Sequence, residues 1–223
     1  MSKRAVLCLI LLALVFAAMA GARSRKRSRS AHSGTPGQFD YYLLSLSWAP
    51  DFCDRPDVNK NSRECGRGNH VGFIVHGLWP QFDNGGYPEQ CAPASPVASG
   101  IVNQMLPLMM DAGLIQHEWR DHGTCSGLSA ADFFGQVQRA YNSVTIPDRY
   151  KNLSQAIQVS PGDVHRDFAS ANPSFPNDAF RVACGGNEVS EVRVCFTKDL
   201  QPRACSTNDK ECSAGELQML PLR

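Results

Sequence analysis

The sequence predicts an α+β fold, a single domain in which several helices pack against a central, mostly antiparallel sheet and disulfides staple the chain. Three observations support this prediction. Two apolar segments typical of buried strands come first, at 41–48 and 71–76. Apolar residues at helical spacing dominate 101–171, and strand-like segments return at 180–184 and 189–197. Cysteines are distributed through the same region, and no internal repeat or second domain boundary interrupts it.

The first two strands flank a polar loop. Tyr41–Trp48 is apolar, rich in aromatic residues and followed closely by a proline. Val71–His76 is a second apolar segment, ended by Gly77. The sequence therefore predicts that His76 lies at the end of a strand, where a side chain can reach a cleft. Residues 80–99 contain four prolines and a Gly-Gly pair, which predicts a long loop of the kind that is often functional.

Four helices are expected in the middle of the chain. Ser129 with Asp132 three residues later, and Ser160 followed by proline, are typical helix starts. Pro107 is expected to break or kink the first helix, and Gly123 to stop the second. The four predicted helices are Ile101–Met110, Ile115–His122, Ser129–Val144 and Ser160–Ala171.

The amino-terminal residues have the pattern of a secretory signal peptide. Lys3 and Arg4 precede the apolar segment Ala5–Ala18, and Ala18-Met19-Ala20 is a small-residue cleavage site. We expect a signal peptide over residues 1–20 and a secreted or periplasmic protein. An uncleaved membrane anchor extending to Ala22 is the alternative, since the apolar segment is just long enough to span a bilayer.

Residues 21–38 are expected to form a disordered basic arm. Residues 23–29 hold five of the 22 Lys and Arg residues, and two more lie in the signal segment. The remaining 15 basic residues face 21 acidic ones, so the rest of the chain lacks the basic excess of a dedicated nucleic-acid binder. The arm is either a plain linker or an electrostatic tether for nucleic acid or an anionic surface.

Cysteine usage supports export. The chain has nine cysteines, and Cys8 lies in the signal segment. An even set of eight in an exported chain predicts four disulfides, although eight cysteines allow 105 pairings. The sequence has no Cys-x-x-Cys pair, which argues against a zinc ribbon. The eight are Cys53, Cys65, Cys91, Cys125, Cys184, Cys195, Cys205 and Cys212.

Two short segments, 73–80 and 117–125, hold three of the six histidines. Histidine titrates near neutrality and can both take and give a proton, so His76, His117 and His122 predict acid–base chemistry. A zinc site of the His-Glu-x-x-His type is the rival, but it needs histidines four apart on one helix face. Here the two histidines of the second segment are five apart. Buried, hydrogen-bonded core histidines are the other alternative.

The neighbours of these histidines suit phosphodiester cleavage. One imidazole would remove a proton from an attacking hydroxyl, and another would protonate the leaving oxygen. Trp79 and Tyr87 could stack a nucleobase, a contact that contributes about 1–3 kcal/mol per base. A place in the core is the lesser alternative for Trp79, and Trp119 is expected to pack there. His32, His70 and His165 are expected to be surface or structural residues.

Both segments resemble the two active-site segments of the ribonuclease T2 family of exported acid ribonucleases. The likeness lies in Phe73 and His76–Pro80, then in His117–Trp119 and His122–Cys125, and extends to Ser47–Pro50 and the cysteines. It covers about residues 39–213, and the end of the chain is most similar to bacterial members. The resemblance implies a catalytic domain over 39–223 that cleaves single-stranded RNA.

The resemblance also implies roles for four residues. His122 would be the general base on the ribose 2′-hydroxyl, and His76 the general acid for the departing 5′-oxygen. His117 would bind phosphate, and Glu118 would help to stabilise the transition state. The product would be a 2′,3′-cyclic phosphate.

Substrate and partner expectations follow from the same resemblance. Trp79 and Tyr87 match positions that stack the base. Gln81 stands at a base-site position that is often acidic in the family, so it indicates no particular base preference. Low base specificity is expected. DNA lacks the 2′-hydroxyl and should be inert. No metal and no cofactor is expected, and the protein should be a monomer.

One residue departs from the family pattern. The position before the last histidine usually carries a lysine, and here it is Asp121, with Arg120 as the neighbouring cation. Asp121 could favour the protonated form of His117 or repel the phosphate, and Arg120 could reach the phosphate or point away. We expect an active enzyme with a more acidic optimum or reduced turnover. An RNA-binding relative with impaired turnover is the alternative.

The family pattern further implies how the cysteines pair. The pairing by resemblance is Cys53–Cys65, Cys91–Cys125, Cys184–Cys212 and Cys195–Cys205.

Overall fold

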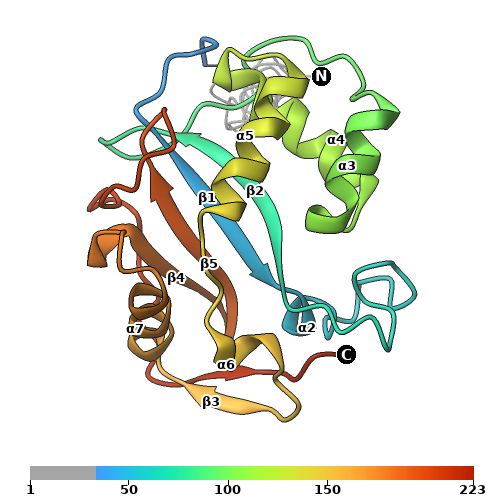
Figure 1. Cartoon of the computed structure of the whole chain (residues 1–223), viewed down its shortest axis with the longest axis vertical. Helices are drawn as coiled ribbons and strands as arrows, with labels where there is room; N and C mark the ends of the chain where they lie inside the picture. Colours follow the sequence, from blue (N-terminus) through green and yellow to red (C-terminus); the bar gives the residue numbers. More distant parts are fainter. Residues whose placement is uncertain (1–33) are drawn as a thin grey trace, which may run out of the picture. The chain divides into compact units, whose positions relative to one another are not determined.

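The computed structural model describes residues 34–223, so the expected signal segment and most of the basic arm lie outside the described residues. Within that range six strands form one sheet (Figure 1). The strands are β1 (Tyr41–Trp48), β2 (Phe73–Gln81), β3 (Ile157–Val159), β4 (Phe180–Gly185), β5 (Glu188–Phe196) and β6 (Leu217–Met219). The helices are α2 (Ala49–Phe52), α3 (Ser99–Met109), α4 (Ala112–Asp121), α5 (Ala130–Asn142), α6 (Asp148–Lys151) and α7 (Pro161–Ala171), with 3-10 turns η1 (Gly123–Ser126) and η2 (Asn177–Ala179).

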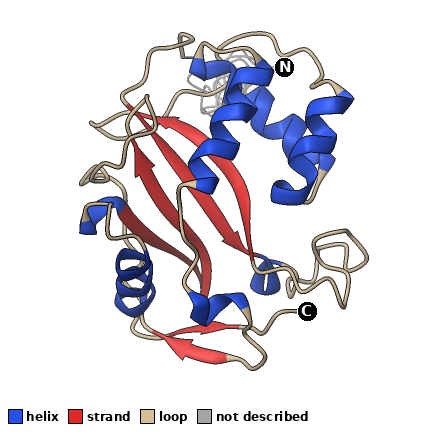
Figure 2. Cartoon of the chain, in the orientation of Figure 1, coloured by secondary structure: helices blue, strands red, loops and turns tan. Residues whose placement is uncertain are grey.

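The sheet is antiparallel except at one junction. Its order is β2-β1-β5-β6-β3, with β4 also paired to β5, and the single parallel contact joins β5 to β6. Helices α3 and α4 lie beside the edge strand β2, and α7 lies beside β4, as the separate blue groups in Figure 2 show. The predicted α+β architecture is therefore confirmed.

Alternation along β1 divides the sheet into two faces. Leu44, Leu46 and Trp48 are fully buried in the main hydrophobic core. The residues between them, Ser45 and Ser47, point to the opposite face because successive side chains of a strand alternate. Small polar side chains at the centre of a buried strand leave that face open for longer side chains from its neighbours.

A β-bulge lies at the centre of β2. Ser45 pairs with Gly77 and Leu46 pairs with Val75, so His76 between them has no partner on β1. The prediction that His76 ends its strand is wrong, because the ladder resumes at Gly77 and β2 continues well beyond it. An extra residue bends the strand and redirects its side chain, which is how bulges are used near active sites.

The predicted helices are present with shifted ends. The Ser129 side chain accepts a hydrogen bond from Asp132 N, and Ser160 forms a capping box, as their positions predicted. Pro107 does not break α3, which continues to Met109 and ends where Met110 adopts a left-handed conformation with φ of 62°. Helix α4 begins earlier than predicted because the Asp111 side chain accepts from Leu114 N at 2.7 Å.

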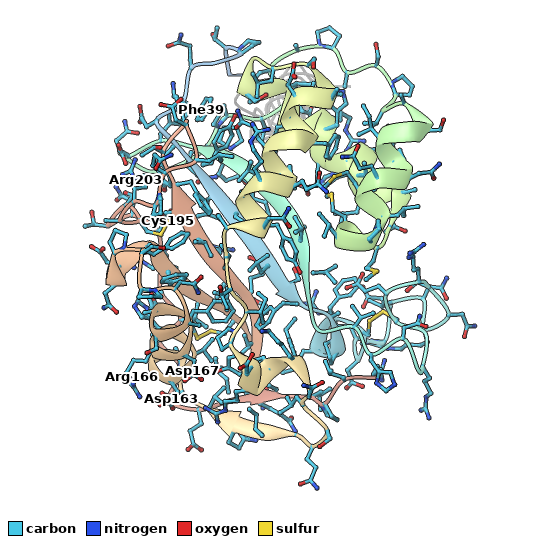
Figure 3. All side chains as sticks on the ribbon, viewed as in Figure 1. Phe39, Asp163, Arg166, Asp167, Cys195 and Arg203 are labelled. Atoms are coloured by element: carbon cyan, nitrogen blue, oxygen red, sulfur yellow. A yellow bond between two sulfur atoms is a disulfide. The ribbon has the colours of Figure 1, made fainter. Side chains whose placement is uncertain are left out.

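All four disulfides have the pairing that the family resemblance implied. Figure 3 labels Cys195, whose partner Cys205 lies in the segment after β5. The pairs are Cys53–Cys65, Cys91–Cys125, Cys184–Cys212 and Cys195–Cys205. No helix within residues 34–223 is both long and apolar enough to cross a membrane.

Candidate active site

The histidines of the two sequence segments converge beside β2. The His76 ring centroid lies 5.1 Å from that of Trp79, and Trp79 lies 5.5 Å from His122. His117 and His122 are separated by 6.4 Å between ring centroids. The bulge in β2 supplies the first histidine, α4 the second, and the residue that caps its carboxyl end the third. The structure therefore brings together all three predicted histidines.

A glycine makes this close approach of helix and strand possible. A Cβ atom at Gly77 would lie 2.0 Å from Glu118 Oε2 and 2.3 Å from Trp79 Nε1, far inside contact distance. No larger residue fits there without displacing both side chains. Gly77 therefore allows α4 to present its carboxylate directly over the strand that carries His76.

Glu118 is buried between the histidines with one oxygen unused. Its residue is 1% exposed, and Trp79 Nε1 donates a hydrogen bond to Oε2 at 2.8 Å. Oε1 has no hydrogen-bond partner and lies 3.8 Å from His76 Nε2 and 4.0 Å from His117 Nε2. Burial raises the pKa of Glu118 to about 7. Below that pH the carboxyl is mostly neutral and can donate a hydrogen bond from the free oxygen.

His122 has the environment of a neutral base. It is 9% exposed, and its Nδ1 is buried without a hydrogen-bond partner. Burial, followed by the nearby His117, lowers the pKa of His122 to about 4. At mildly acidic and neutral pH the imidazole is therefore uncharged and free to accept a proton.

His76 has the opposite environment. Its Nδ1 lies 2.7 Å from Glu191 Oε1. Burial alone would lower the pKa of His76, but the hydrogen bond and charge of Glu191, assisted by Glu118, outweigh it and raise the pKa. Two neighbouring titratable groups whose pKa values are shifted in opposite directions are the usual sign of an acid and base pair.

His117 is held from behind by an ion pair. Its Nδ1 lies 2.8 Å from Asp121 Oδ2 and 2.8 Å from Arg120 Nη2. Arg120 Nε donates to Asp121 Oδ1 at 2.7 Å, which lowers the pKa of Asp121, and Gln90 Nε2 donates to the same oxygen at 3.1 Å. The Arg120 side chain therefore reaches the site. Its positive charge balances the negative charge of Asp121, which reduces the repulsion between that carboxylate and a bound phosphate.

The predicted base-binding residues line one cavity of about 270 Å³. Tyr87 is 47% exposed, and its ring centroid lies 6.0 Å from that of His122. An aromatic side chain at the exposed rim of a cavity can stack on a planar ligand. The lining residues are Leu43, Trp79, Gln81, Tyr87, Glu89, His122, Arg193 and Asp209.

A second cavity of about 160 Å³ opens beside His76. It is bordered by β1, α2 and the start of β5, and its walls carry four carboxyl groups and one arginine. Burial raises the pKa of Asp51 and of Glu64 to about 7. The polar lining residues are Ser47, Asp51, Arg55, Glu64, His76, Glu188, Ser190 and Glu191. His76 thus borders the smaller cavity, and Trp79 borders only the larger one.

Two site residues could not be found from the sequence motifs. Glu191 and Arg193 lie on β5, and Arg193 lines the larger cavity while Glu191 contacts His76. The sequence does indicate that both lie on one face of β5, because they alternate with the buried Val192 and therefore point away from the core side of the strand. Which face carries the site depends on the pairing of β5 with β1, and alternation does not give that pairing.

Among residues 34–223, the potential metal ligands that lie within 4.8 Å of one another are on Cys195, Cys205 and Asp209. The two cysteines form a disulfide with each other, so neither is a free thiolate ligand.

Trp119 packs against Phe133 at 6.0 Å between ring centroids, which confirms its predicted place at the core. His165 hydrogen bonds to Asn177 O and is structural, as expected.

The sequence matches a family model described as the Ribonuclease T2 family over residues 39–205. The chain belongs to the ribonuclease T2 family. The matched range includes both histidine segments and extends through β5 to the last cysteine of the Cys195–Cys205 pair. The sequence resemblance is thereby confirmed.

Curated relatives include bacterial ribonucleases. A probable ribonuclease of Haemophilus influenzae is 29% identical over 182 residues, which is 75% of this chain and 61% of that protein. A ribonuclease of Aeromonas hydrophila is 40% identical over 100 residues, which is 45% of this chain and 44% of that protein. This chain thus spans less than two thirds of the length of either relative.

A solved structure shows the same fold. The RNase-related protein from Calystegia sepium has a TM-score of 0.65 and 23% sequence identity, and the match covers 82% of this chain and 98% of that one. The agreement extends over nearly the whole neighbour, so the α+β arrangement described above is that of the ribonuclease T2 family.

Proposed function

We propose that the protein is a metal-independent endoribonuclease that cleaves single-stranded RNA by transphosphorylation, with low base specificity and no cofactor. One observation carries the proposal: His76 and His122 both lie next to Trp79, and their pKa values are shifted in opposite directions. A proton donor and a proton acceptor are then ready together at mildly acidic pH. Family membership and the curated ribonuclease relatives support the substrate class.

The proposed first step uses the substrate's own nucleophile. Neutral His122 takes the proton of the ribose 2′-hydroxyl, and the 2′-oxygen attacks the adjacent phosphorus. The P–O5′ bond breaks, and protonated His76 gives its Nε2 proton to the departing 5′-oxygen. The products are a 2′,3′-cyclic phosphate and a free 5′-hydroxyl. A second step adds water to the cyclic phosphate with the two histidines exchanging roles.

The charge that develops on the phosphate meets donors on α4. Glu118 Oε1 faces the Nε2 atoms of both His76 and His117, and a phosphoryl group between them would contact all three. The raised pKa of Glu118 lets the neutral carboxyl donate to a phosphoryl oxygen instead of repelling it. His117, backed by Asp121 and Arg120, presents its other nitrogen as the phosphate ligand.

The two cavities suggest where the nucleosides lie. Trp79 and Tyr87 would stack the base on the 2′-hydroxyl side, with Gln81 at the cavity wall. The smaller cavity beside His76 would receive the leaving nucleoside, since His76 protonates its 5′-oxygen. Stacking tolerates any base, which supports low base specificity. DNA lacks the nucleophile and should be inert.

A single assay tests this function against its rivals. A dinucleoside monophosphate is incubated with the protein between about pH 4 and 8, with and without EDTA, and cyclic phosphate is measured. We expect kcat/KM to rise as His122 deprotonates near pH 4. It should fall as His76 deprotonates, at a pH above 6.5, the ordinary pKa of histidine. No cyclic phosphate would identify the RNA-binding relative, and loss of activity with EDTA would identify a zinc hydrolase.

The position before His122 gives a more specific prediction. Asp121 is one of the groups that raise the pKa of His122, whereas burial lowers it, so the acidic limb follows from burial. The sequence-based expectation of a more acidic optimum or reduced turnover stays a prediction. In Asp121→Lys the charge is reversed, and the acid limb of the pH–rate profile should move to lower pH by about 0.5 to 1 unit.

A neutral variant is the control for that experiment. Asp121→Asn keeps an oxygen for Arg120 but removes the charge, and its limb should lie between those of the wild type and Asp121→Lys. An unchanged profile in both variants would show that the carboxylate of Asp121 has no electrostatic effect on His122.

We also propose that the protein is exported and acts as a monomer. Residues 1–20 would be removed as a signal peptide, 21–38 would remain as a basic arm, and 39–223 would be the catalytic domain. Four disulfides fit an oxidising compartment. Tyr87 is the large hydrophobic residue that is exposed among residues 34–223, and it belongs to the proposed RNA site, so no wide apolar surface favours self-association. Amino-terminal sequencing of the protein from the periplasm or medium tests the cleavage.

A further inference from the structure

His76 is backed by a carboxylate from a strand two places away in the sheet. Glu191 pairs with Ser47 of β1, while His76 lies on β2 on the other side of β1. Adjacent strands are about 4.8 Å apart, so the two backbones are separated by roughly 10 Å. The side chains nevertheless meet at 2.7 Å between His76 Nδ1 and Glu191 Oε1.

Two features of the intervening strands permit this contact. Ser45 and Ser47 have short side chains, so a glutamate on β5 can extend across β1 without a clash. The bulge turns His76 out of the regular ladder on the neighbouring strand. The contact between Glu191 and His76 thus explains why two polar residues interrupt the apolar sequence of β1.

Arg193 holds Glu191 in place. Arg193 lies two residues further along β5 and therefore on the same face. Its Nε and Nη2 donate to Glu191 Oε2 at 2.9 Å and 2.8 Å, while Oε1 accepts from His76. Glu191 is 8% exposed, and both of its oxygens are satisfied. Burial would raise the pKa of Glu191, but these contacts outweigh it and lower the pKa to about 2, so the carboxylate is ionised throughout the working range.

His122, the proposed general base, has no such carboxylate. His122 Nδ1 is buried without a hydrogen-bond partner, whereas His76 Nδ1 faces an ionised carboxylate. A carboxylate at Nδ1 fixes the ring orientation, places a proton on that nitrogen and stabilises the imidazolium. The proton available for transfer is then on Nε2, the atom that faces Glu118 and the proposed phosphate position.

We propose that Glu191, held by Arg193, is a positioning residue that keeps His76 protonated and oriented as the general acid. This inference rests on the proposed ribonuclease function and adds to it the group that distinguishes the acid from the base. Glu191 borders the smaller cavity but does not contact the reacting atoms in this scheme, and it acts on the reaction through the imidazole of His76.

Other charged groups also face His76 and set the background. From α4, the ionised form of Glu118 favours the imidazolium, and from β5, Arg193 opposes it. Glu64, in the loop before β2, and His122 also lie within electrostatic reach. Of these groups, Glu191 alone is hydrogen bonded to the ring of His76 in the part of the chain that the structure describes. Removing Glu191 should therefore have a larger effect on His76 than removing any of the others.

The central experiment is Glu191→Gln in the full chain, with two readouts. An NMR titration of the His76 ring should show a midpoint above 6.5 in the wild type and a lower midpoint in the variant. The alkaline limb of kcat/KM for a dinucleoside monophosphate should move to lower pH by the same amount. At neutral pH the rate should fall by at least about tenfold, because general acid–base catalysis contributes about 10²- to 10⁴-fold.

A second substrate separates positioning from general damage to the fold. A uridine 3′-(4-nitrophenyl phosphate) has a leaving group that departs without a general acid. Glu191→Gln should cleave it at close to the wild-type rate, and Glu191→Asp should recover part of the lost dinucleotide activity. Equal losses on both substrates would overturn the inference, as would an unchanged His76 midpoint.

Glu211→Gln is the matched control. Glu211 also faces a histidine, His165, at 3.8 Å, but lies outside the proposed active site. We expect wild-type rates on both substrates. If the wild type releases no cyclic phosphate, the proposed function fails, and the titration still decides whether Glu191 holds the proton on His76.

Discussion

Replacing His122 with alanine should reduce kcat/KM for a dinucleoside monophosphate by about 10²- to 10⁴-fold, the usual contribution of a general base. His122 is the buried histidine whose pKa is lowered to about 4, and its Nδ1 has no hydrogen-bond partner. The acid limb of the pH–rate profile should disappear with it, because that limb reports the protonation of this residue. Steady-state kinetics between about pH 3 and 8, a range that includes the acid limb, measure both effects.

The same loss is expected for His76→Ala, but there the alkaline limb should disappear. The double variant should lose little more than either single one, since an acid and a base that act in one step are not additive. His165→Ala is the control, because that histidine hydrogen bonds to Asn177 O outside the site. A His122→Ala protein that kept its acid limb and most of its rate would contradict the assignment of the base.

Removing the Cys91–Cys125 disulfide should lower the free energy of unfolding by about 3–4 kcal/mol, because the bond closes a loop whose ends are 34 residues apart. Cys125 lies in η1 directly after His122. The neighbour of Cys91, Gln90, hydrogen bonds through its backbone N to Asp121 O and through its side chain to Asp121. The Cys91→Ala/Cys125→Ala variant should therefore also lose activity while it is still folded. Denaturant unfolding and kinetics at low temperature measure the two effects.

A second disulfide provides the comparison. Cys184 and Cys212 are 28 residues apart and lie outside both histidine segments, and their removal should cost a similar free energy. The Cys184→Ala/Cys212→Ala variant should keep the wild-type kcat/KM under conditions where it is folded. Equal activity in the two variants would mean that the first disulfide stabilises the domain without shaping its site.

Long elements with a clear period could be predicted from the sequence. The apolar segment of β1, the alternation of β5 and the capping serines of α5 and α7 each fix one element locally, and all were confirmed. Helices α2 and α6 and strands β3 and β6 were missed because three or four residues contain too little periodicity. The start of α4 was missed because its cap, Asp111, precedes an alanine and a glycine rather than an apolar residue.

The site was predicted where its residues are close in the chain and missed where strands bring them together. Glu118 and His122 belong to one motif, and His76 and Trp79 to another, so motif matching found them. Glu191 could not be found in this way, because its contact with His76 depends on the pairing of β5 with β1 and on a bulge in β2. The bulge itself has no local sequence signal beyond a glycine that we interpreted as the end of the strand.

The order in which the chain is made gives the Glu191–His76 contact one more consequence. The two residues are separated by 115 positions, and β5 is the last strand in the described chain that is longer than three residues. A growing polypeptide contains all three histidines long before it contains Glu191. The surroundings of His76 are therefore complete only after β5 has paired with β1, and under the proposed mechanism the general acid becomes functional at that late stage of synthesis.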